Sequence, residues 1–258
     1  MRRHRALLTL VTALAVLTAT VGAAVTAVPE SVAAPAATAA DRPNVVFIVA
    51  DDMRADDLAY MPAVNRLLVD KGTRWPQAYA VNPQCCPSRS TFLTGRYSHN
   101  TGVMDNQPRP HGGWSAFRDD EPDTIATWLD RAGYHTGYIG KYLNGYEGAA
   151  PRRVPPGWDE WRVPVSGMYR YDGTATYNVD GTLKARTGYQ DAIRTRMATT
   201  FLRNRSQAPM FLTVSYLAPH GSPQPGRGFT HPVPLPPPRP RLRRDAPPPQ
   251  PGGRQPDG

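Results

Sequence analysis

The chain has 258 residues, of which 40% are hydrophobic, and a formal net charge of +9. It is long enough to bury a sizeable core, and its two cysteines, Cys85 and Cys86, exclude a disulfide-rich scaffold. The charge is uneven, because residues 1–40 contribute +2, residues 226–258 contribute +4, and residues 41–225 keep +3. The high net charge therefore does not by itself indicate a nucleic-acid partner, whereas a mildly basic body is compatible with an anionic ligand.

Residues 1–40 have the pattern of a secretory signal peptide. Three arginines within the first five residues precede an apolar run from Ala6 to about Val28, and Ala37-Thr38-Ala39 forms a cleavage pattern. The run is nearly long enough to cross a bilayer, so an uncleaved anchor is the alternative, but its weak hydrophobicity favours cleavage. We therefore expect a protein that is secreted or held in the cell envelope and that meets the membrane only through this segment.

Strand and helix patterns alternate along residues 41–225. In chain order we predict a strand over 45–50, a helix over 62–71 with Leu67 and Leu68 on its apolar face, a short helix over 88–94, a helix over 124–132 with Asp123 as N-cap, a strand over 134–139, a hairpin over 169–183 with its turn at Asp180-Gly181, a helix over 191–204 and a strand over 210–217. The first strand is a continuous apolar run, as expected of a buried parallel strand. This alternation predicts an α/β layered fold without internal repeats.

Asp51 and Asp52 directly follow the first predicted strand. In open α/β sheets, ligands bind outside the carboxyl ends of the strands. Two adjacent carboxylates at such a place are natural ligands for a hard cation such as calcium. A solvated turn or helix start is the commoner role of an Asp-Asp pair, and we expect that role for Asp56 and Asp57.

The most distinctive stretch of the chain is Cys85-Cys86-Pro87-Ser88-Arg89, which Ser90–Arg96 follows. Pro87 suits the first turn of a helix, and Gly95 suits its left-handed end. The first cysteine then lies at the positive helix N-terminus, where backbone N–H groups favour anions, and Arg89 reaches back toward it. The alternatives are an ordinary buried cysteine, a strained disulfide between the adjacent cysteines, or a metal site, which would need further ligands.

Residues 226–258 form a tail that is rich in proline and arginine. The tail contains 11 prolines and six arginines but few apolar side chains. It cannot bury enough surface to offset its chain entropy, so we expect it to be disordered. A shifted reading frame in GC-rich DNA would encode a similar Pro/Arg-rich sequence, so a frameshift is one hypothesis for the origin of this tail. The arginines are not interleaved with aromatic residues for base stacking, so we expect no nucleic-acid partner.

The cysteine motif reads C-x-P-S-R-x-x-x-L-T-G-R and resembles the signature of the sulfatase family. Gly133–Asn144 resembles the second sulfatase signature, G-Y-x-T-x-x-x-G-K, and puts Lys141 just after a predicted strand, where it can pair with a sulfate oxygen. Tyr216–His220 ends the last predicted strand, and the family has a histidine there that contacts the sulfate or the leaving-group oxygen. The resemblance covers about residues 42–220.

This resemblance implies the N-terminal portion of an alkaline-phosphatase-like α/β/α sandwich and the hydrolysis of a sulfate ester. Cys85 is then oxidised to formylglycine by a formylglycine-generating enzyme. The hydrated aldehyde attacks sulfur, the alcohol leaves, and the second hydroxyl expels sulfate and regenerates the aldehyde.

The resemblance also implies a cation site and a set of positively charged groups. Calcium, held partly by Asp51, Asp52 and the residue at position 85, polarises the sulfate oxygens. The remaining positive charge and the proton donor come from Arg89, Lys141 and His220.

Lys141-Tyr142-Leu143-Asn144 departs from the pattern of many sulfatases, which carry a histidine two residues after this lysine. This form and the doubled cysteine resemble the N-acetylglucosamine-6-sulfatase-like branch. The implied substrate is a sulfated carbohydrate or an aryl sulfate, and Asn144 is a candidate site contact. His99, His111 and His135 lack a comparable placement, so we interpret them as structural or surface residues.

Sulfatases complete the metal site with a later Asp-Asn or Asp-His pair and a further lysine, and no such element follows His220. The chain therefore resembles a sulfatase that is truncated at its C-terminus, and an inactive fragment with a half-built calcium site is one alternative. A phosphodiesterase or phosphonate hydrolase of the same superfamily is another, because some of these share C-x-P-S-R.

Overall fold

The computed structural model describes residues 42–108, 110–204, 208–224 and 228–230. All of these residues belong to one unit, Thr38–Gly258. The expected signal peptide and most of the expected tail lie outside the described residues. Within the described ranges, no helix combines the length and the hydrophobicity that are needed to cross a membrane.

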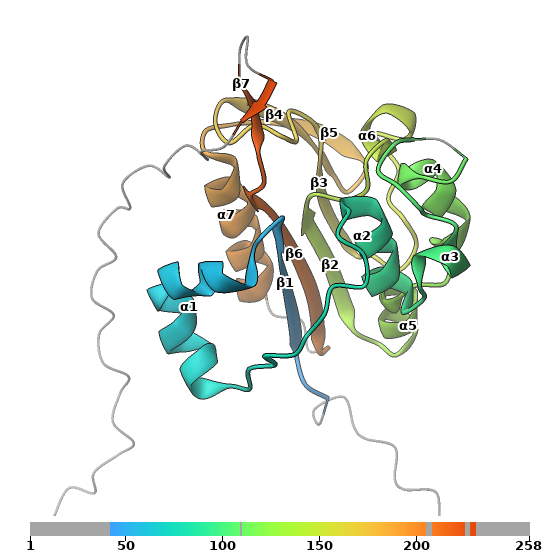
Figure 1. Ribbon diagram of the computed structural model, residues 1–258. Helices are drawn as coiled ribbons and strands as arrows, with labels where there is room; N and C mark the ends of the chain where they lie inside the picture. Colours follow the sequence, from blue (N-terminus) through green and yellow to red (C-terminus); the bar gives the residue numbers. More distant parts are fainter. Residues whose placement is uncertain (1–41, 109, 205–207, 225–227, 231–258) are drawn as a thin grey trace, which may run out of the picture. The chain divides into compact units, whose positions relative to one another are not determined.

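A six-stranded mixed sheet, in the order β1-β6-β2-β3-β4-β5, organises the described region (Figure 1). Its strands are β1 (Val45–Asp51), β2 (His135–Gly140), β3 (Glu160–Ser166), β4 (Thr174–Val179), β5 (Thr182–Thr187) and β6 (Met210–Pro219). The first four in spatial order are parallel, whereas β4 and β5 are antiparallel. Because β1, β6 and β2 are parallel neighbours, their carboxyl ends meet at one edge of the sheet.

Helices cover both faces of this sheet (Figure 1). On one face, α7 (Gln190–Arg203) packs against β6 and β2, with Phe201 fully buried in that core. On the other face, α5 (Ile125–Arg131) packs against β2 and contacts α2 (Cys85–Thr94), and the core there includes Trp161. The three layers confirm the predicted α/β/α class.

The remaining elements are short and lie in the connections. They are the 3₁₀ helices η2 (Ala55–Tyr60), η3 (Val69–Lys71) and η4 (Arg118–Asp120), the helices α1 (Pro62–Leu67), α3 (Ser98–Thr101), α4 (Gly113–Phe117) and α6 (Tyr146–Ala149), and the paired strands β7 (Ser222–Gln224) and β8 (Gly228–Thr230). β8 falls within the tail that we expected to be disordered. Residues 226–231 contain no proline, so their N–H groups remain available for strand pairing.

Two predicted elements differ in detail from the structure. The N-cap of α5 is Thr124 rather than Asp123, because Thr124 has the extended backbone of a cap and its N–H donates to Thr127 Oγ1 at 3.1 Å. Asp123 instead accepts a hydrogen bond from Trp128 Nε1 at 2.7 Å. The predicted hairpin turn is at the predicted place, but its strands are β4 and β5 and thus begin and end later than expected.

We predicted that the first strand and the apolar face of the first helix are buried. In the described structure this prediction is wrong. Val45 and Ile48 on β1 are 38% and 55% exposed, because β1 lies at the edge of the sheet and pairs only with β6 among the described residues. The helix predicted over 62–71 ends at Leu67 and continues as η3, and Leu67 and Leu68 are 54% and 58% exposed.

Candidate active site

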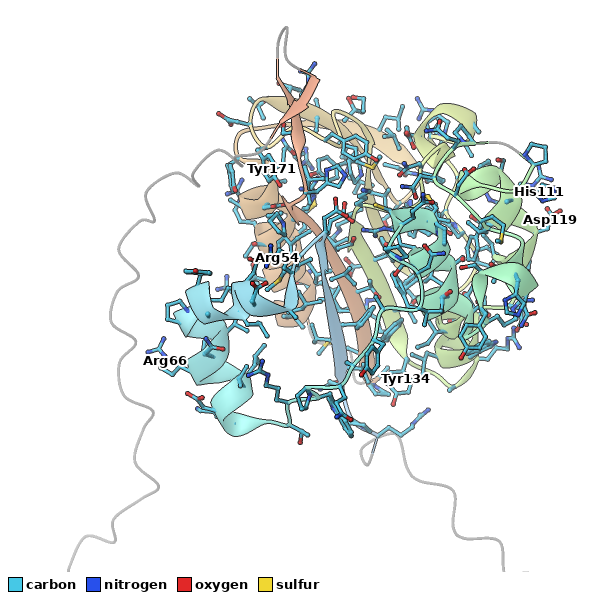
Figure 2. The ribbon with its side chains drawn as sticks, viewed as in Figure 1. Arg54, Arg66, His111, Asp119, Tyr134 and Tyr171 are labelled. Carbon is cyan, nitrogen blue, oxygen red and sulfur yellow. The ribbon has the colours of Figure 1, made fainter. Side chains whose placement is uncertain are left out.

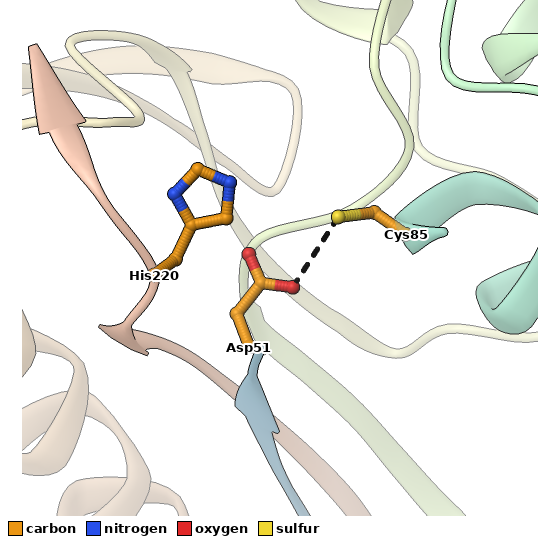
Figure 3. Close-up of side chains that lie close together, drawn as sticks. All are labelled: Asp51, Cys85 and His220. Atoms are coloured by element: carbon orange, nitrogen blue, oxygen red, sulfur yellow. Dashed lines mark hydrogen bonds between the residues drawn. The ribbon is translucent and has the colours of Figure 1, made fainter. Parts of the chain in front are cut away.

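Four predicted site residues meet where the strand ends converge. Asp51 is the last residue of β1, Cys85 is the first of α2, Lys141 follows β2, and His220 follows β6. Figure 3 shows the side chains of Asp51, Cys85 and His220 close together at this edge. One ligand atom from each of these three lies within 4.8 Å of the others. The fold therefore gathers residues that are up to 169 positions apart in the sequence.

The helix α2 presents Cys85 at its N-terminus. It begins three residues earlier than predicted, so Pro87 is the third helical residue and still lies in the first turn. Gly95 ends the helix with a left-handed φ of 67°, as predicted. The N–H of Cys86 donates to Asn106 Oδ1 at 2.8 Å. Asn106 thus satisfies one of the first-turn donors, a contact that the sequence motif did not indicate.

A buried cluster of charges surrounds the Cys85 thiol. Asp51 Oδ1 accepts a hydrogen bond from Arg89 Nη2 at 3.0 Å, and Asp51 Oδ2 accepts one from Lys141 Nζ at 2.5 Å. Cys85 Sγ lies 3.6 Å from Asp51 Oδ1 and 3.4 Å from Lys141 Nζ. Lys141, Arg89 and Asp51 are only 0%, 2% and 5% exposed. One buried carboxylate thus faces two buried cations, and the second carboxylate of this edge, Asp52, is partly exposed beside His220.

Hydrogen bonds fix the guanidinium of Arg89 in this cluster. Arg89 Nη1 donates to the carbonyl oxygen of Lys141 and to Ser215 Oγ, both at 2.7 Å. The hydroxyl of Tyr138 donates to the same Lys141 carbonyl at 2.7 Å. Because a planar guanidinium can donate in several fixed directions, Arg89 ties α2 to the ends of β2 and β6.

The cluster keeps its charges at neutral pH. Burial raises the pKa of Asp51, but the cations of Arg89 and Lys141 outweigh burial, so that the pKa lies below its ordinary value. Burial lowers the pKa of Lys141, but the Asp51 carboxylate outweighs this effect and holds the pKa above its ordinary value. Both groups therefore remain ionised, and the positive charge is preorganised.

The two cysteines differ from activated thiols. Burial raises the pKa of the Cys85 thiol despite the nearby Lys141 ammonium. Burial also raises the pKa of Cys86, to about 11, and its sulfur accepts a hydrogen bond from the Asn144 N–H at 3.2 Å. Both thiols therefore favour the protonated form at neutral pH, so an unmodified cysteine nucleophile is not favoured here.

The raised pKa values of the two thiols predict how they react in protein whose Cys85 is unmodified. Alkylation by iodoacetamide at pH 7.5 should be slower at Cys85 than in a free cysteine peptide, and Cys86, which is fully buried, should stay unreacted in the folded chain. The Cys85 rate should continue to rise above pH 9 as the thiolate forms. Peptide mass spectrometry after timed quenching measures both rates, and rapid labelling of Cys85 at neutral pH would contradict the argument.

Tyr169 connects three of the site residues, although no sequence motif indicated it. Its ring centroid lies 4.7 Å from Lys141 Nζ and 5.0 Å from the ring of His220. Its hydroxyl donates to Asn144 Oδ1 at 3.1 Å. His220 also lies beside Asp52, with 3.5 Å between Nε2 and Oδ2. The loop before β4 therefore positions the lysine and the histidine through one aromatic ring.

The two aspartates of the predicted cation site have different environments. Asp51 is buried, whereas the Asp52 side chain is 45% exposed on a residue with a left-handed φ of 59°. Of the expected cation ligands, the structure groups Asp51 and Cys85 with His220 rather than with Asp52. Asp56 is exposed and pairs with Arg54 at the start of η2, a place typical of a solvated helix start.

His99, His111 and His135 have other surroundings than His220. His135 stacks on Phe201 with a 5.2 Å centroid separation, and His99 stacks on Tyr97 with 5.7 Å. His111 is exposed, and Figure 2 shows it on the side of the helical region that faces away from β1.

A cavity of about 650 Å³ opens beside the cluster. Asp51, Cys85 and Arg89 line its polar part, and apolar side chains such as Phe47 and Phe92 line the remainder. A small anionic group can therefore reach residue 85 from solvent, with the bulk of the ligand against an apolar surface.

The comparisons with known proteins agree with this geometry. Residues 43–239 match the family model described as Sulfatase. The chain belongs to the sulfatase family. The match confirms the family that the two signatures predicted.

Several relatives of this sulfatase chain have known names. An "Extracellular sulfatase SULF-1 homolog" from Drosophila melanogaster is 38% identical over 203 residues, which are 74% of this chain and 18% of the relative. An "N-acetylglucosamine-6-O-sulfatase" from Bacteroides thetaiotaomicron is 32% identical over 191 residues, 69% of this chain and 31% of the relative. The sulfatase chain thus spans about a third or less of these relatives.

Solved structures with the same fold support the assignment. One is a complex with its substrate, D-glucosamine-2-N,6-O-disulfate, and has a TM-score of 0.54 and 27% sequence identity. The matched region covers 70% of this chain and 36% of the solved chain. Another is Ps i-CgsB in complex with a neocarrahexaose, which has a TM-score of 0.60 and 27% sequence identity. The matched region covers 71% of this chain and 46% of the solved chain. The sulfatase fold of this chain therefore corresponds to less than half of each neighbour.

Proposed function

We propose that this sulfatase chain contributes the nucleophile and the cationic wall of a site that hydrolyses sulfate esters, with Cys85 converted to formylglycine. The observation that carries the proposal is the place of Cys85 Sγ, which is 3.4 Å from Lys141 Nζ at the start of a helix. Sγ marks the position at which an oxygen of the hydrated aldehyde would lie. Formylglycine would supply a hydroxyl nucleophile, which fits a site where the thiol itself stays protonated.

Arg89 and Lys141 bind the anionic part of the substrate in this proposal. Their combined charge exceeds that of Asp51, so the cluster attracts an anion and needs no rearrangement when negative charge grows on the sulfate oxygens. Lys141 acts as a point charge, and Arg89 acts mainly by holding Asp51 and the strand ends in place.

The carboxylates fit one side of a calcium site. Calcium takes about six to eight oxygen ligands, and Asp51 and Asp52 provide carboxylate oxygens beside residue 85. His220 offers a nitrogen, which calcium does not prefer. We propose that Asp51, Asp52 and residue 85 hold one side of the ion and that the other donors come from outside the described residues. When bound, calcium would polarise the sulfate oxygens.

His220 acts in this proposal as the proton donor to the leaving oxygen. It lies at the end of β6, with Asp52 near Nε2 and the ring of Tyr169 beside it. A histidine side chain within reach of a leaving oxygen can act as a general acid. Asn144 lies behind Tyr169 and would act through it rather than on the substrate.

The substrate that we propose is a sulfated carbohydrate, with aryl sulfates as artificial substrates. Relatives are named N-acetylglucosamine-6-sulfatases, and one structural neighbour binds a glucosamine disulfate. The extracellular relative supports export through residues 1–40. A formylglycine-generating enzyme would be the partner that modifies Cys85 before export.

The test is hydrolysis by purified chain, produced together with a formylglycine-generating enzyme, of an aryl sulfate and of the matching aryl phosphate diester. We expect faster release from the sulfate ester. Faster release from the phosphate diester would favour the phosphodiesterase alternative. A full-length relative that is prepared in the same way is the positive control. If that relative is active and this chain shows no turnover, the chain is an inactive fragment. The exposed first strand and the incomplete set of cation ligands among the described residues favour this alternative.

Replacing Tyr169 tests its positioning of Lys141. Tyr169→Leu removes the ring from the ammonium, which should weaken the binding of inorganic sulfate by about 5–30-fold, as expected for a desolvated cation–π contact. Tyr169→Phe keeps the ring but removes the hydroxyl, and with it the contacts of that hydroxyl to Asn144 and Lys141, so it should lose less sulfate binding than Tyr169→Leu. Titration calorimetry with sulfate measures this contrast, and equal losses in both variants would contradict it.

A further inference from the structure

The buried carboxylate of Asp191 lies beside the end of β6 and is not part of the site described above. Asp191 is the second residue of α7 and is 8% exposed. Its Oδ1 accepts a hydrogen bond from the N–H of Leu217 at 3.3 Å, and its Oδ2 accepts one from the N–H of Ala218 at 3.2 Å. A carboxylate on α7 thus binds the backbone of β6 just before His220.

Asp191 takes the place of a strand partner at this point of β6. The ladder of β6 with β2 ends at Ser215, and its register with β1 shifts after Tyr216. Among the described strands, Leu217 and Ala218 therefore have no paired residue on either side. A buried N–H without an acceptor is costly. The two bonds to Asp191 let β6 leave the ladder here with its donors satisfied.

Arg194 connects Asp191 to the loop before β4. Arg194 is fully buried, and its Nη1 donates to Asp191 Oδ1 while its Nη2 donates to the carbonyl oxygen of Met168 at 3.5 Å. In the same loop, the hydroxyl of Tyr171 donates to the carbonyl oxygen of His220 at 2.6 Å. One buried ion pair therefore holds both segments that position the backbone of His220.

The ring of His220 has a defined orientation in this arrangement. Its Nδ1 lies 2.5 Å from the carbonyl oxygen of Gly221, and because a carbonyl oxygen only accepts, Nδ1 carries a proton. Nε2 lies 3.5 Å from Asp52 Oδ2. Nε2 is then the nitrogen that can give a proton to a substrate.

We propose that Asp191 is a positioning residue for His220, because it holds the end of β6 so that Nε2 faces the leaving oxygen of the sulfate ester. The inference rests on the proposed role of His220 as proton donor. In that step the bond between sulfur and the leaving oxygen breaks, the oxygen keeps the electron pair, and the proton on Nε2 moves to it. Asp191 acts through the backbone of residues 217–220, to which its bonds go.

NMR of the ¹⁵N-labelled full chain tests the positioning without turnover. A ring N–H that donates to a carbonyl exchanges slowly with water and gives a resolved signal, which is assigned to His220 by its absence in His220→Gln. We expect this Nδ1–H signal in the unchanged chain and its loss in Asp191→Asn, whose amide NH₂ meets one of the two backbone donors. The amides of Leu217 and Ala218 should exchange at least ~10-fold faster in that variant.

Two further variants separate positioning from stability. Arg194→Lys keeps a cation beside Asp191 and leaves both backbone bonds, so it is the matched control and should keep the signal. Asp191→Asn combined with Arg194→Gln removes both buried charges together, so it avoids an uncompensated charge and should still lose the signal. Circular dichroism confirms that each variant is folded. A signal that persists in either folded Asp191 variant, or that is lost equally in Arg194→Lys, would overturn the proposal.

The dependence of the rate on the leaving group separates this proposal from the proposed function. A sugar hydroxyl needs a proton as it leaves, whereas a nitrophenolate does not. Asp191→Asn should therefore slow the hydrolysis of a sulfated sugar at least ~10-fold more than that of nitrophenyl sulfate, as should His220→Gln. Equal losses on both esters would overturn the positioning role. If the unchanged chain hydrolyses neither ester, the proposed function fails, and the NMR comparison alone decides whether Asp191 positions His220.

Discussion

Asp51→Asn should destabilise the folded chain by about 3–5 kcal/mol, because it leaves Arg89 and Lys141 buried without their shared anion. The side chains have nearly the same shape, so the loss would come from charge rather than from packing. Lys141 would relieve part of the cost by losing its proton. Urea unfolding at pH 7, followed by circular dichroism, measures the difference in the free energy of unfolding.

The pH dependence of that difference identifies its origin. The pKa of Asp51 is lower in the folded chain than in the unfolded chain. The stabilisation is therefore fully present above the unfolded carboxyl pKa of about 3.9 and is lost as the pH falls through the folded value. The difference in stability between Asp51→Asn and the unchanged chain should accordingly begin to shrink once the pH falls below about 4. Asp56→Asn, at an exposed ion pair with Arg54, is the control and should leave stability unchanged at every pH.

A loss from Asp51→Asn no larger than that from the exposed control would contradict a buried, mutually dependent cluster. So would a constant difference down to pH 3, because that would show a packing effect. Neither measurement needs turnover, so the test separates the structure of the site from its activity.

Cys85→Ala should reduce aryl sulfate hydrolysis by ~10⁴-fold or more, because it removes the nucleophile while the cationic wall remains. Cys86→Ala should keep most of the activity, since Cys86 lies in the core and only accepts a hydrogen bond from the Asn144 N–H. The two neighbours thus form a matched pair of variants. Initial rates at saturating substrate, with sulfate release measured directly, give the comparison, and equal activity of the two variants would contradict the assignment of roles.

The sequence predicted those parts of the site that depend on local pattern. An apolar run followed by Asp51 indicates a strand whose end carries a carboxylate, and Gly95 indicates the end of a short helix that starts near Cys85. Parallel strands then bring their carboxyl ends together, so Lys141 and His220 could be placed at the same edge before the structure was known.

The remaining features depend on contacts between distant residues. Tyr169 reaches Lys141 and His220 from a loop without regular structure, and Asn106 caps α2 from twenty residues away in the chain. The exposure of β1 could not be predicted either, because an apolar run indicates what a strand is suited to contact, whereas its neighbours in the sheet are set by pairing.

The most direct test of the central claim is mass spectrometry of the peptide that contains Cys85, taken from chain produced in its native host. The account predicts an aldehyde at position 85, which a hydrazine probe captures, and an unmodified thiol at Cys86 in the same peptide. A free thiol at both positions, in chain from a host whose other sulfatases are converted, would contradict the claim that Cys85 is the precursor of the nucleophile.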